Sequence, residues 1–200
     1  MDMLNMVFLA GMLIFVVSSV YFHFAGKKNG LNSAFLVSLI TLISYVIMWQ
    51  GEFTAVKAAG QPIFWTRWLF YALSCTLLAV EIARLKGIKG SGLVEILYLT
   101  AIVMFTGFLA ARDLTAVRWI YFFISCAAYG LLLVRVLPGK DQESNWVNSY
   151  IFFGWSVFPV VFLLAPTGVG IIGAALGNLL YLVLDVFTKI VFYIQSARKA

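Results

Sequence analysis

The chain is dominated by long apolar runs, separated by short segments rich in glycine, proline and charged residues. A run of about 20 apolar residues is long enough to cross the hydrocarbon core of a bilayer as a helix. Boundaries set at the Gly, Pro and charge clusters predict seven helices, over residues 3–25, 32–51, 62–86, 92–111, 115–137, 146–165 and 169–196. We therefore predict an all-α membrane protein, a single seven-helix transmembrane bundle over residues 1–200.

The composition strengthens this interpretation. Hydrophobic residues make up 63% of the chain and charged residues 11%, and the mean hydropathy is +1.00. A soluble domain keeps roughly a quarter of its residues charged. The first run lacks the basic start and small-residue cleavage site of a signal peptide, so we interpret it as the first span. We expect a multi-pass protein of the cell membrane whose function lies inside the bilayer.

Basic residues in the short loops set the expected orientation, because cytoplasmic loops carry an excess of Lys and Arg. With the N-terminus outside, nine basic residues fall on the cytoplasmic side: Lys27, Lys28, Arg84, Lys86, Lys89, Arg135, Lys140, Arg198 and Lys199. Three fall outside: Lys57, Arg112 and Arg118. We expect an extracellular N-terminus and a cytoplasmic C-terminus. The net charge of +6 is then explained by loop ends beside anionic lipid, without a nucleic-acid partner.

Apart from the charged residues near the span ends, four charged residues lie within the predicted spans: Arg67, Glu81, Asp185 and Lys189. A charge at mid-bilayer depth costs at least about 2.5–3.5 kcal/mol on insertion scales. Asp185 and Lys189 are four residues apart, so they lie on one helix face, about 6 Å apart along the axis. One interpretation is an ion pair that lets two costly groups insert together. The other is chemical: desolvation favours a neutral, nucleophilic lysine amine that forms a Schiff base, with Asp185 as its counterion.

A long conjugated ligand on that lysine needs a slot walled by aromatic rings, and residues 146–165 offer one in WSVFPVVF. Trp155, Phe158 and Phe162 have spacings of three and seven, which place them on one face. Pro159 removes a backbone hydrogen bond and is expected to kink the helix. Simple packing is the alternative interpretation of an aromatic stripe.

Three motifs together, LDVFTK, WSVFP and RWLF…S, resemble those of the microbial (type 1) rhodopsins, and the resemblance covers essentially the whole chain. It implies all-trans-retinal attached to Lys189 as a protonated Schiff base, with Asp185 as a counterion. Trp155 and Tyr71 are expected to flank the polyene. The residues predicted to bind the cofactor are Lys189, Trp155, Tyr71, Phe158, Pro159 and Phe162. Relatives are commonly trimers, so the resemblance also implies a homotrimer in membrane lipid.

Residues 62–86 determine the expected direction of transport. Arg67, Phe70, Ser74 and Glu81 fall within an arc of about 60° of a helix, which makes this face a polar stripe interrupted at Phe70. Outward-pumping relatives carry a carboxylate at the position of Phe70, and phenylalanine has no acceptor atom. The Phe–Ser–Glu pattern resembles the schizorhodopsins, an archaeal branch of inward proton pumps.

That resemblance implies a light-driven inward proton pump rather than an enzyme. The imine proton would move toward the cytoplasm with the help of Glu81, and would be replaced from the extracellular side. The residues predicted to carry the proton chemistry are Asp185, Glu81, Arg67, Phe70, Ser74 and Cys75. For Cys75, plain packing and a tuning role near the Schiff base both remain open.

Three alternatives stay open at this point. A photosensor signalling to a partner protein would share the retinal-binding residues, and a retinal-free transporter would use Asp185 and Lys189 as a substrate pair. Glu81 would be an interfacial acid if it served only to pair with Arg84. With one histidine and two separated cysteines, we predict no transition-metal site.

Smaller roles are expected for several other residues. We predict interfacial packing for His23, a hydrogen bond near Asp185 for Tyr45, and solvation or a place at the cytoplasmic exit for Glu95. Asn178 is either a helix–helix hydrogen bond or a link in the extracellular half-channel. Close helix packing is expected at three glycines, Gly154, Gly173 and Gly177.

Overall fold

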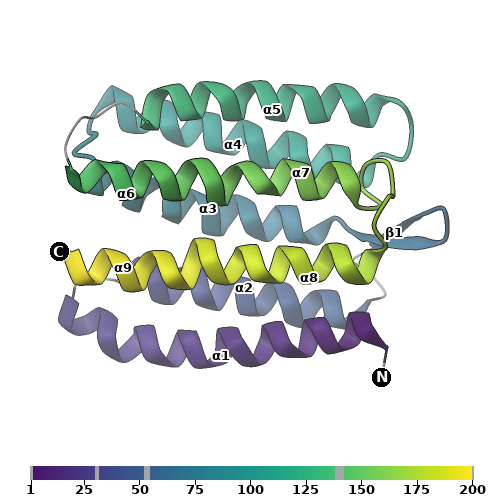
Figure 1. Cartoon of the computed structure of the whole chain (residues 1–200), viewed down its shortest axis with the longest axis horizontal. Helices are drawn as coiled ribbons and strands as arrows, with labels where there is room; N and C mark the ends of the chain where they lie inside the picture. The colour runs from purple at the N-terminus through teal and green to yellow at the C-terminus, as the bar shows by residue number, and fades with distance from the viewer. Residues whose placement is uncertain (1, 30–31, 52–54, 138–141, 200) are drawn as a thin grey trace.

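The computed structural model describes residues 2–29, 32–51, 55–137 and 142–199 of the chain. Within these ranges, seven helical spans are long and apolar enough to cross a membrane. They run nearly side by side, and the two termini lie at opposite ends of the bundle (Figure 1). The predicted seven-helix membrane fold is therefore confirmed.

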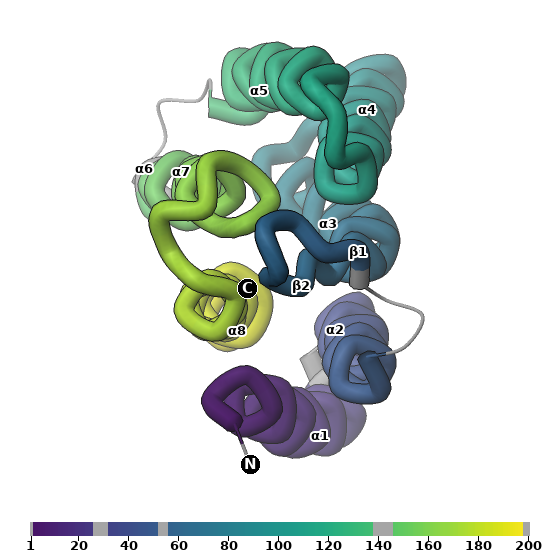
Figure 2. The backbone as a smooth tube through the Cα atoms, turned by 90° about the vertical axis from the view of Figure 1, so that its right-hand side faces the viewer, coloured from purple at the N-terminus to yellow at the C-terminus, as the bar shows by residue number. Residues whose placement is uncertain are grey.

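The first five spans are single helices: α1 (Met3–Asn29), α2 (Asn32–Gln50), α3 (Thr66–Leu85), α4 (Ser91–Arg112) and α5 (Val117–Val136). The sixth span consists of α6 (Gln142–Tyr150), the π-helical segment η1 (Ile151–Trp155) and α7 (Ser156–Leu164). The seventh consists of α8 (Ala174–Asp185), the π-helical segment η2 (Val186–Val191) and α9 (Phe192–Lys199). Neighbouring spans follow one another around the bundle, and α8 packs against α1 (Figure 2).

A short antiparallel hairpin precedes α3, made of β1 (Ala55–Ala58) and β2 (Gln61–Phe64). Ala59 and Gly60 both have positive φ, 49° and 78°, as the two-residue turn of a type I′ hairpin requires. The hairpin lies across one end of the bundle, which we call the hairpin end (Figure 2). The other end, where α9 finishes, is the C-terminal end.

Two predicted helix starts were wrong. Residues 62–64 belong to β2, because the turn at Ala59–Gly60 reverses the chain and the strands pair before α3 begins at Thr66. Residues 169–173 are not helical: Gly170 has a φ of +72° and Gly173 is extended, so the last span begins at Ala174.

Close packing is confirmed for two of the three glycines. A Cβ added to Gly154 would lie 3.2 Å from Thr188 Cγ2, so η1 and η2 approach closely there. A Cβ on Gly177 would lie 3.2 Å from the Cβ of Ala165. For Gly173 the packing prediction was wrong, since the nearest atom to an added Cβ is 4.0 Å away and this glycine precedes α8.

Candidate functional site

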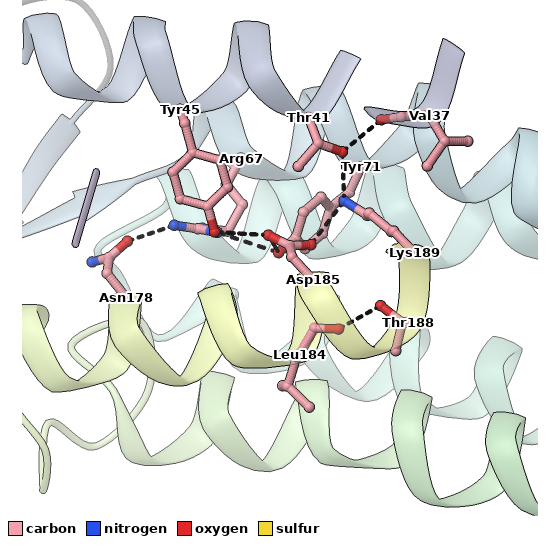
Figure 3. Close-up of polar contacts among 10 residues, drawn as sticks. All are labelled: Val37, Thr41, Tyr45, Arg67, Tyr71, Asn178, Leu184, Asp185, Thr188 and Lys189. Carbon is pink, nitrogen blue, oxygen red and sulfur yellow. Dashed lines mark hydrogen bonds and ion pairs between the residues drawn. The ribbon is translucent and has the colours of Figure 1, made fainter. Parts of the chain in front are cut away.

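The Lys189 ammonium and the Asp185 carboxylate form a buried ion pair, as their spacing predicted. Lys189 Nζ lies 2.8 Å from Asp185 Oδ1, and the two side chains are 2% and 0% exposed. Lys189 Nζ also donates a hydrogen bond to Thr41 Oγ1 at 3.1 Å, and Thr41 in turn donates to the carbonyl of Val37 (Figure 3). The amine thus reaches from η2 across the bundle to α2.

The second oxygen of Asp185 is surrounded by donors. Tyr45 Oη donates to Asp185 Oδ2 at 2.9 Å and Tyr71 Oη donates to it at 3.0 Å. Arg67 Nη1 lies 3.4 Å from the same oxygen (Figure 3). Charge-assisted hydrogen bonds of this kind stabilise the ionised carboxylate. The hydrogen bond expected for Tyr45 is confirmed, and Tyr71 contributes a hydroxyl donor that was not predicted.

Arg67 is buried between this carboxylate and the hairpin end. Its Nη2 donates to Asn178 Oδ1 at 2.6 Å, so Asn178 makes the helix–helix hydrogen bond that was one of its two predicted roles. The guanidinium carbon also lies 4.9 Å from the centroid of the Tyr181 ring. Arg67 and Lys189 therefore place two buried cations around the single carboxylate of Asp185.

A cavity of about 830 Å³, including open space, has Lys189 among its lining residues. All six residues predicted to bind a cofactor line it: Lys189, Trp155, Tyr71, Phe158, Pro159 and Phe162. Cys75 lines it as well. A cavity lined by aromatic rings and by a residue with a buried primary amine suits an apolar ligand that ends in an aldehyde.

The comparison with known proteins agrees with this chemistry. The family described as bacteriorhodopsin-like protein matches residues 2–197 of the chain. The chain belongs to this family. It is therefore a microbial rhodopsin, a member of a family of light-driven pumps and sensors that bind retinal through a lysine.

The similar proteins include a schizorhodopsin, a sensory rhodopsin and a bacteriorhodopsin. The crystal structure of schizorhodopsin 4 shares 35% identity and a TM-score of 0.92, covering 97% of this chain and 98% of that one. Sensory rhodopsin-2 of Haloarcula vallismortis is 27% identical over 165 residues, 76% of this chain and 70% of the relative. Bacteriorhodopsin of Halobacterium salinarum is 27% identical over 197 residues, 91% of this chain and 75% of the relative. The resemblance to the microbial rhodopsins, including a schizorhodopsin, is confirmed.

The polar stripe predicted on the third span of the rhodopsin faces the interior. Arg67, Ser74 and Glu81 are buried on α3, while Phe70 between them is partly exposed. The Ser74 hydroxyl makes no hydrogen bond of ordinary geometry to the described residues. These three buried polar residues are therefore spread along α3 from the Arg67 end of the site toward the C-terminal end of the bundle.

Glu81 makes the ion pair with Arg84 that was one of the two interpretations considered for it. Its carboxylate pairs with Arg84, whose Nη2 lies 2.6 Å from Glu81 Oε1 and whose Nε lies 3.2 Å from both oxygens. The Glu81 side chain is only 7% exposed, whereas that of Arg84 is 55% exposed. The arginine therefore reaches inward from the surface to a carboxylate that lies inside the bundle.

Two walls of the rhodopsin's cavity were missed by sequence reasoning. Four lining residues come from α4: Thr100, Val103, Met104 and Gly107. Five more come from α5: Phe122, Ser125, Cys126, Tyr129 and Leu132. Both sets have spacings of three, four and seven, which mark one helix face. The small and polar residues at that spacing could have indicated a cavity wall. They were not predicted because neither span carries a buried charge on this face.

The residues expected to have smaller roles are placed at the ends of the spans. His23 lies between the rings of Phe24 and Phe35, each at 5.3 Å between centroids, so its expected packing is confirmed. Glu95 pairs with Arg135 at 2.8 Å, and both side chains are more than 40% exposed, as expected for a solvated acid.

Proposed function

We propose that the protein is a light-driven inward proton pump with retinal bound to Lys189 as a protonated Schiff base. The observation that carries the proposal is the state of Asp185. Its carboxylate already faces Lys189, two tyrosine hydroxyls and Arg67, so its oxygens are occupied by donors within the bundle. The other buried carboxylate among the described residues, Glu81, lies toward the C-terminal end.

In this proposal, Lys189, Asp185 and Phe70 have different roles. Bound retinal supplies the absorption of visible light and the all-trans to 13-cis change that follows it. Lys189 Nζ holds the proton in the dark, between Asp185 and Thr41. Asp185 balances the charge of that proton without taking it. Phe70, one turn beyond Arg67 on α3, has no atom that can accept a proton on the hairpin side.

Glu81 gives the proton a direction. Its position, 14 residues beyond Arg67 on α3, corresponds to about 21 Å along a helix. The excess of Lys and Arg in the loops at the C-terminal end assigns this end to the cytoplasm. In the proposed pump, the Glu81 carboxylate, which is paired with Arg84, attracts a proton released from Lys189 toward that side.

A polar region at the hairpin end supports proton uptake from the opposite side. A second cavity of about 330 Å³, including open space, has Arg67, Thr167, Asn178 and Tyr181 among its lining residues. These side chains offer hydroxyl, amide and guanidinium groups to water entering from the extracellular end. Arg67, which contacts both this cavity and Asp185, connects the uptake region with the Lys189 site.

The decisive experiment measures the pH of a weakly buffered suspension of cells that express the protein with added retinal. Illumination should make the medium more alkaline, and a protonophore should abolish the change. Lys189→Ala should remove both the visible band and the pH change. Light-driven acidification would contradict the direction, and a colourless wild type would point instead to a retinal-free transporter.

A photosensor is the second candidate, favoured by the 27% identity with sensory rhodopsin-2 of Haloarcula vallismortis. Such a protein would bind retinal in the same cavity and show little net transport. A stable visible band without any light-driven pH change, under conditions where a known proton pump produces one, would favour this function over pumping.

A further inference from the structure

The ring of Tyr45 is held in a slot formed by α1. Phe15 stacks against it, with 5.8 Å between centroids and an interplanar angle of 14°. Phe8 meets it edge to face, with 6.4 Å between centroids. Gly11 lies between these two phenylalanines on the same helix face. All three aromatic rings are buried, so the slot is closed to solvent and lipid.

Gly11 forms the floor of this slot, and no larger residue fits there. A Cβ added to Gly11 would lie 2.5 Å from Tyr45 Cδ1, 2.6 Å from Cε1 and 2.8 Å from Cγ. Separations below 3.0 Å require something to move. The clash includes Cγ, at the root of the ring, so rotating the far end of the side chain does not relieve it. Either the whole ring shifts or α1 and α2 separate.

Either movement acts on the Asp185 site. Tyr45 Oη donates to Asp185 Oδ2 at 2.9 Å and lies 3.4 Å from Arg67 Nη1. Hydrogen bonds weaken steeply as distance and angle depart from ideal values. A displacement of several tenths of an ångström at the ring therefore takes one donor away from the carboxylate.

We propose that Gly11 is a positioning residue for the retinal counterion: by leaving space for the Tyr45 ring, it fixes the phenol that donates to Asp185. The inference rests on the proposed function only in taking Lys189 as the attachment site and Asp185 as the counterion. It does not depend on the direction in which protons move. The first span thereby acts on the charge facing Lys189 through Tyr45.

The sign of the effect follows from the electrostatics. The groups around Asp185 are Lys189 on η2, Tyr45 on α2, and Arg67 and Tyr71 on α3. A carboxylate that loses a phenol donor presents more of its negative charge to the Lys189 nitrogen. This stabilises positive charge at the nitrogen in the dark state, which raises the excitation energy. Gly11→Ala and Tyr45→Phe should therefore both shift the visible band to shorter wavelength.

The test is a double-substitution comparison on the retinal-bound protein. Gly11→Ala should shift the band in the same direction as Tyr45→Phe, by at least half as much. Added to Tyr45→Phe, the Gly11 change should produce little further shift, because the donor is already absent. Gly130→Ala is the matched control, since this exposed helical glycine has nothing within 4 Å of an added Cβ.

A second readout avoids retinal altogether. In the retinal-free protein with ¹³C-labelled tyrosine, the Tyr45 Cζ resonance should move in Gly11→Ala and stay in place in Gly130→Ala. If Gly11→Ala does not fold, Phe15→Leu is the alternative variant, because it removes the ring stacked on Tyr45 without adding atoms. It should shift the visible band in the same direction by a smaller amount. An unshifted band and resonance in folded Gly11→Ala, or an equal shift in the Tyr45→Phe background, would overturn the proposal.

The two proposals fail in different ways. Light-driven acidification would end the inward-pump proposal and leave the role of Gly11 intact. A visible band that survives Lys189→Ala would remove the basis of both. If the protein pumps protons inward but Gly11→Ala leaves its visible band unchanged, only the positioning role of Gly11 is overturned.

Discussion

Lys189 Nζ lies 2.8 Å from Asp185 Oδ1, and neither side chain is more than 2% exposed. Because Arg67 approaches the other carboxylate oxygen, one buried anion balances two buried cations. Removing one partner of a buried ion pair leaves an uncompensated charge and typically costs about 3–5 kcal/mol. Asp185 is therefore the side chain on which both the stability of this region and the protonation of Lys189 depend.

We predict that Asp185→Asn removes the visible band at neutral pH and replaces it with a near-ultraviolet band. Without the carboxylate, the protonated nitrogen of Lys189 lies near Arg67 with no anion, so it loses its proton more easily. Absorption spectra across a pH series test this, and the visible band should return on acidification. Glu95→Gln is the control, since its exposed pair with Arg135 is worth about 0–1 kcal/mol. An unchanged neutral-pH spectrum in Asp185→Asn would contradict the counterion assignment.

Tyr71 is expected to affect colour more than Tyr45, because it contacts the site twice. Its hydroxyl donates to Asp185 Oδ2 at 3.0 Å, and its ring centroid lies 4.3 Å from Lys189 Nζ. Tyr71→Phe keeps the ring and removes the donor, which should shift the band to shorter wavelength. Tyr71→Leu removes the ring as well, so the amine loses its cation–π contact and the protonated form should be less stable still. Equal spectra for the two variants would show that the ring contributes nothing.

Glu81→Gln should separate transport from colour. Glu81 lies ten residues beyond Tyr71 on α3, about 15 Å along a helix, so the absorption maximum should stay within a few nanometres of wild type. The light-driven pH change should fall several-fold, since the amide no longer attracts the proton. Arg84→Gln is the variant to compare with Glu81→Gln, because it leaves the Glu81 carboxylate in place but removes its ion pair. Full transport in Glu81→Gln would contradict the role proposed for this carboxylate.

The spans and the Lys189–Asp185 pair were predictable because their signals are local. An apolar run, a buried charge and a spacing of four residues can each be read within one helix. The aromatic stripe of Trp155, Phe158 and Phe162 was local in the same sense, and all three residues line the cavity.

What sequence reasoning missed depends on how the helices are rotated against one another. Thr41 reaches Lys189 only because α2 turns that face inward, and the Tyr45 position depends on the space left by Gly11. The π-helical segment η2, which carries Lys189, adds a residue to the helical turn without any Gly or Pro to mark it. The hairpin was missed because its turn places Ala59 at positive φ, which is uncommon for a residue other than glycine.

A clamp at the C-terminal end provides a test of stability that is independent of retinal. Lys86 Nζ, just after α3, donates to the carbonyl of Val136 and to Asn148 Oδ1, while Asn148 Nδ2 donates to the Leu137 carbonyl at 2.9 Å. These contacts join the ends of the third, fifth and sixth spans. Lys86→Met leaves both acceptors without this donor, and a buried acceptor without a partner costs about 1–3 kcal/mol, so the unfolding midpoint in detergent should fall. Lys89→Met, at an exposed lysine nearby, should not.

We also predict how the contribution of Lys86 to the stability of the protein changes with pH. Burial lowers the pKa of Lys86 below its ordinary value of 10.5. Between the folded and unfolded pKa values the unfolded chain binds more protons, so stability rises with pH across this interval. Wild type and Lys89→Met should therefore gain stability relative to Lys86→Met as the pH approaches 10.5. Parallel stability curves for all three proteins would show that the Lys86 amine is not desolvated by the clamp.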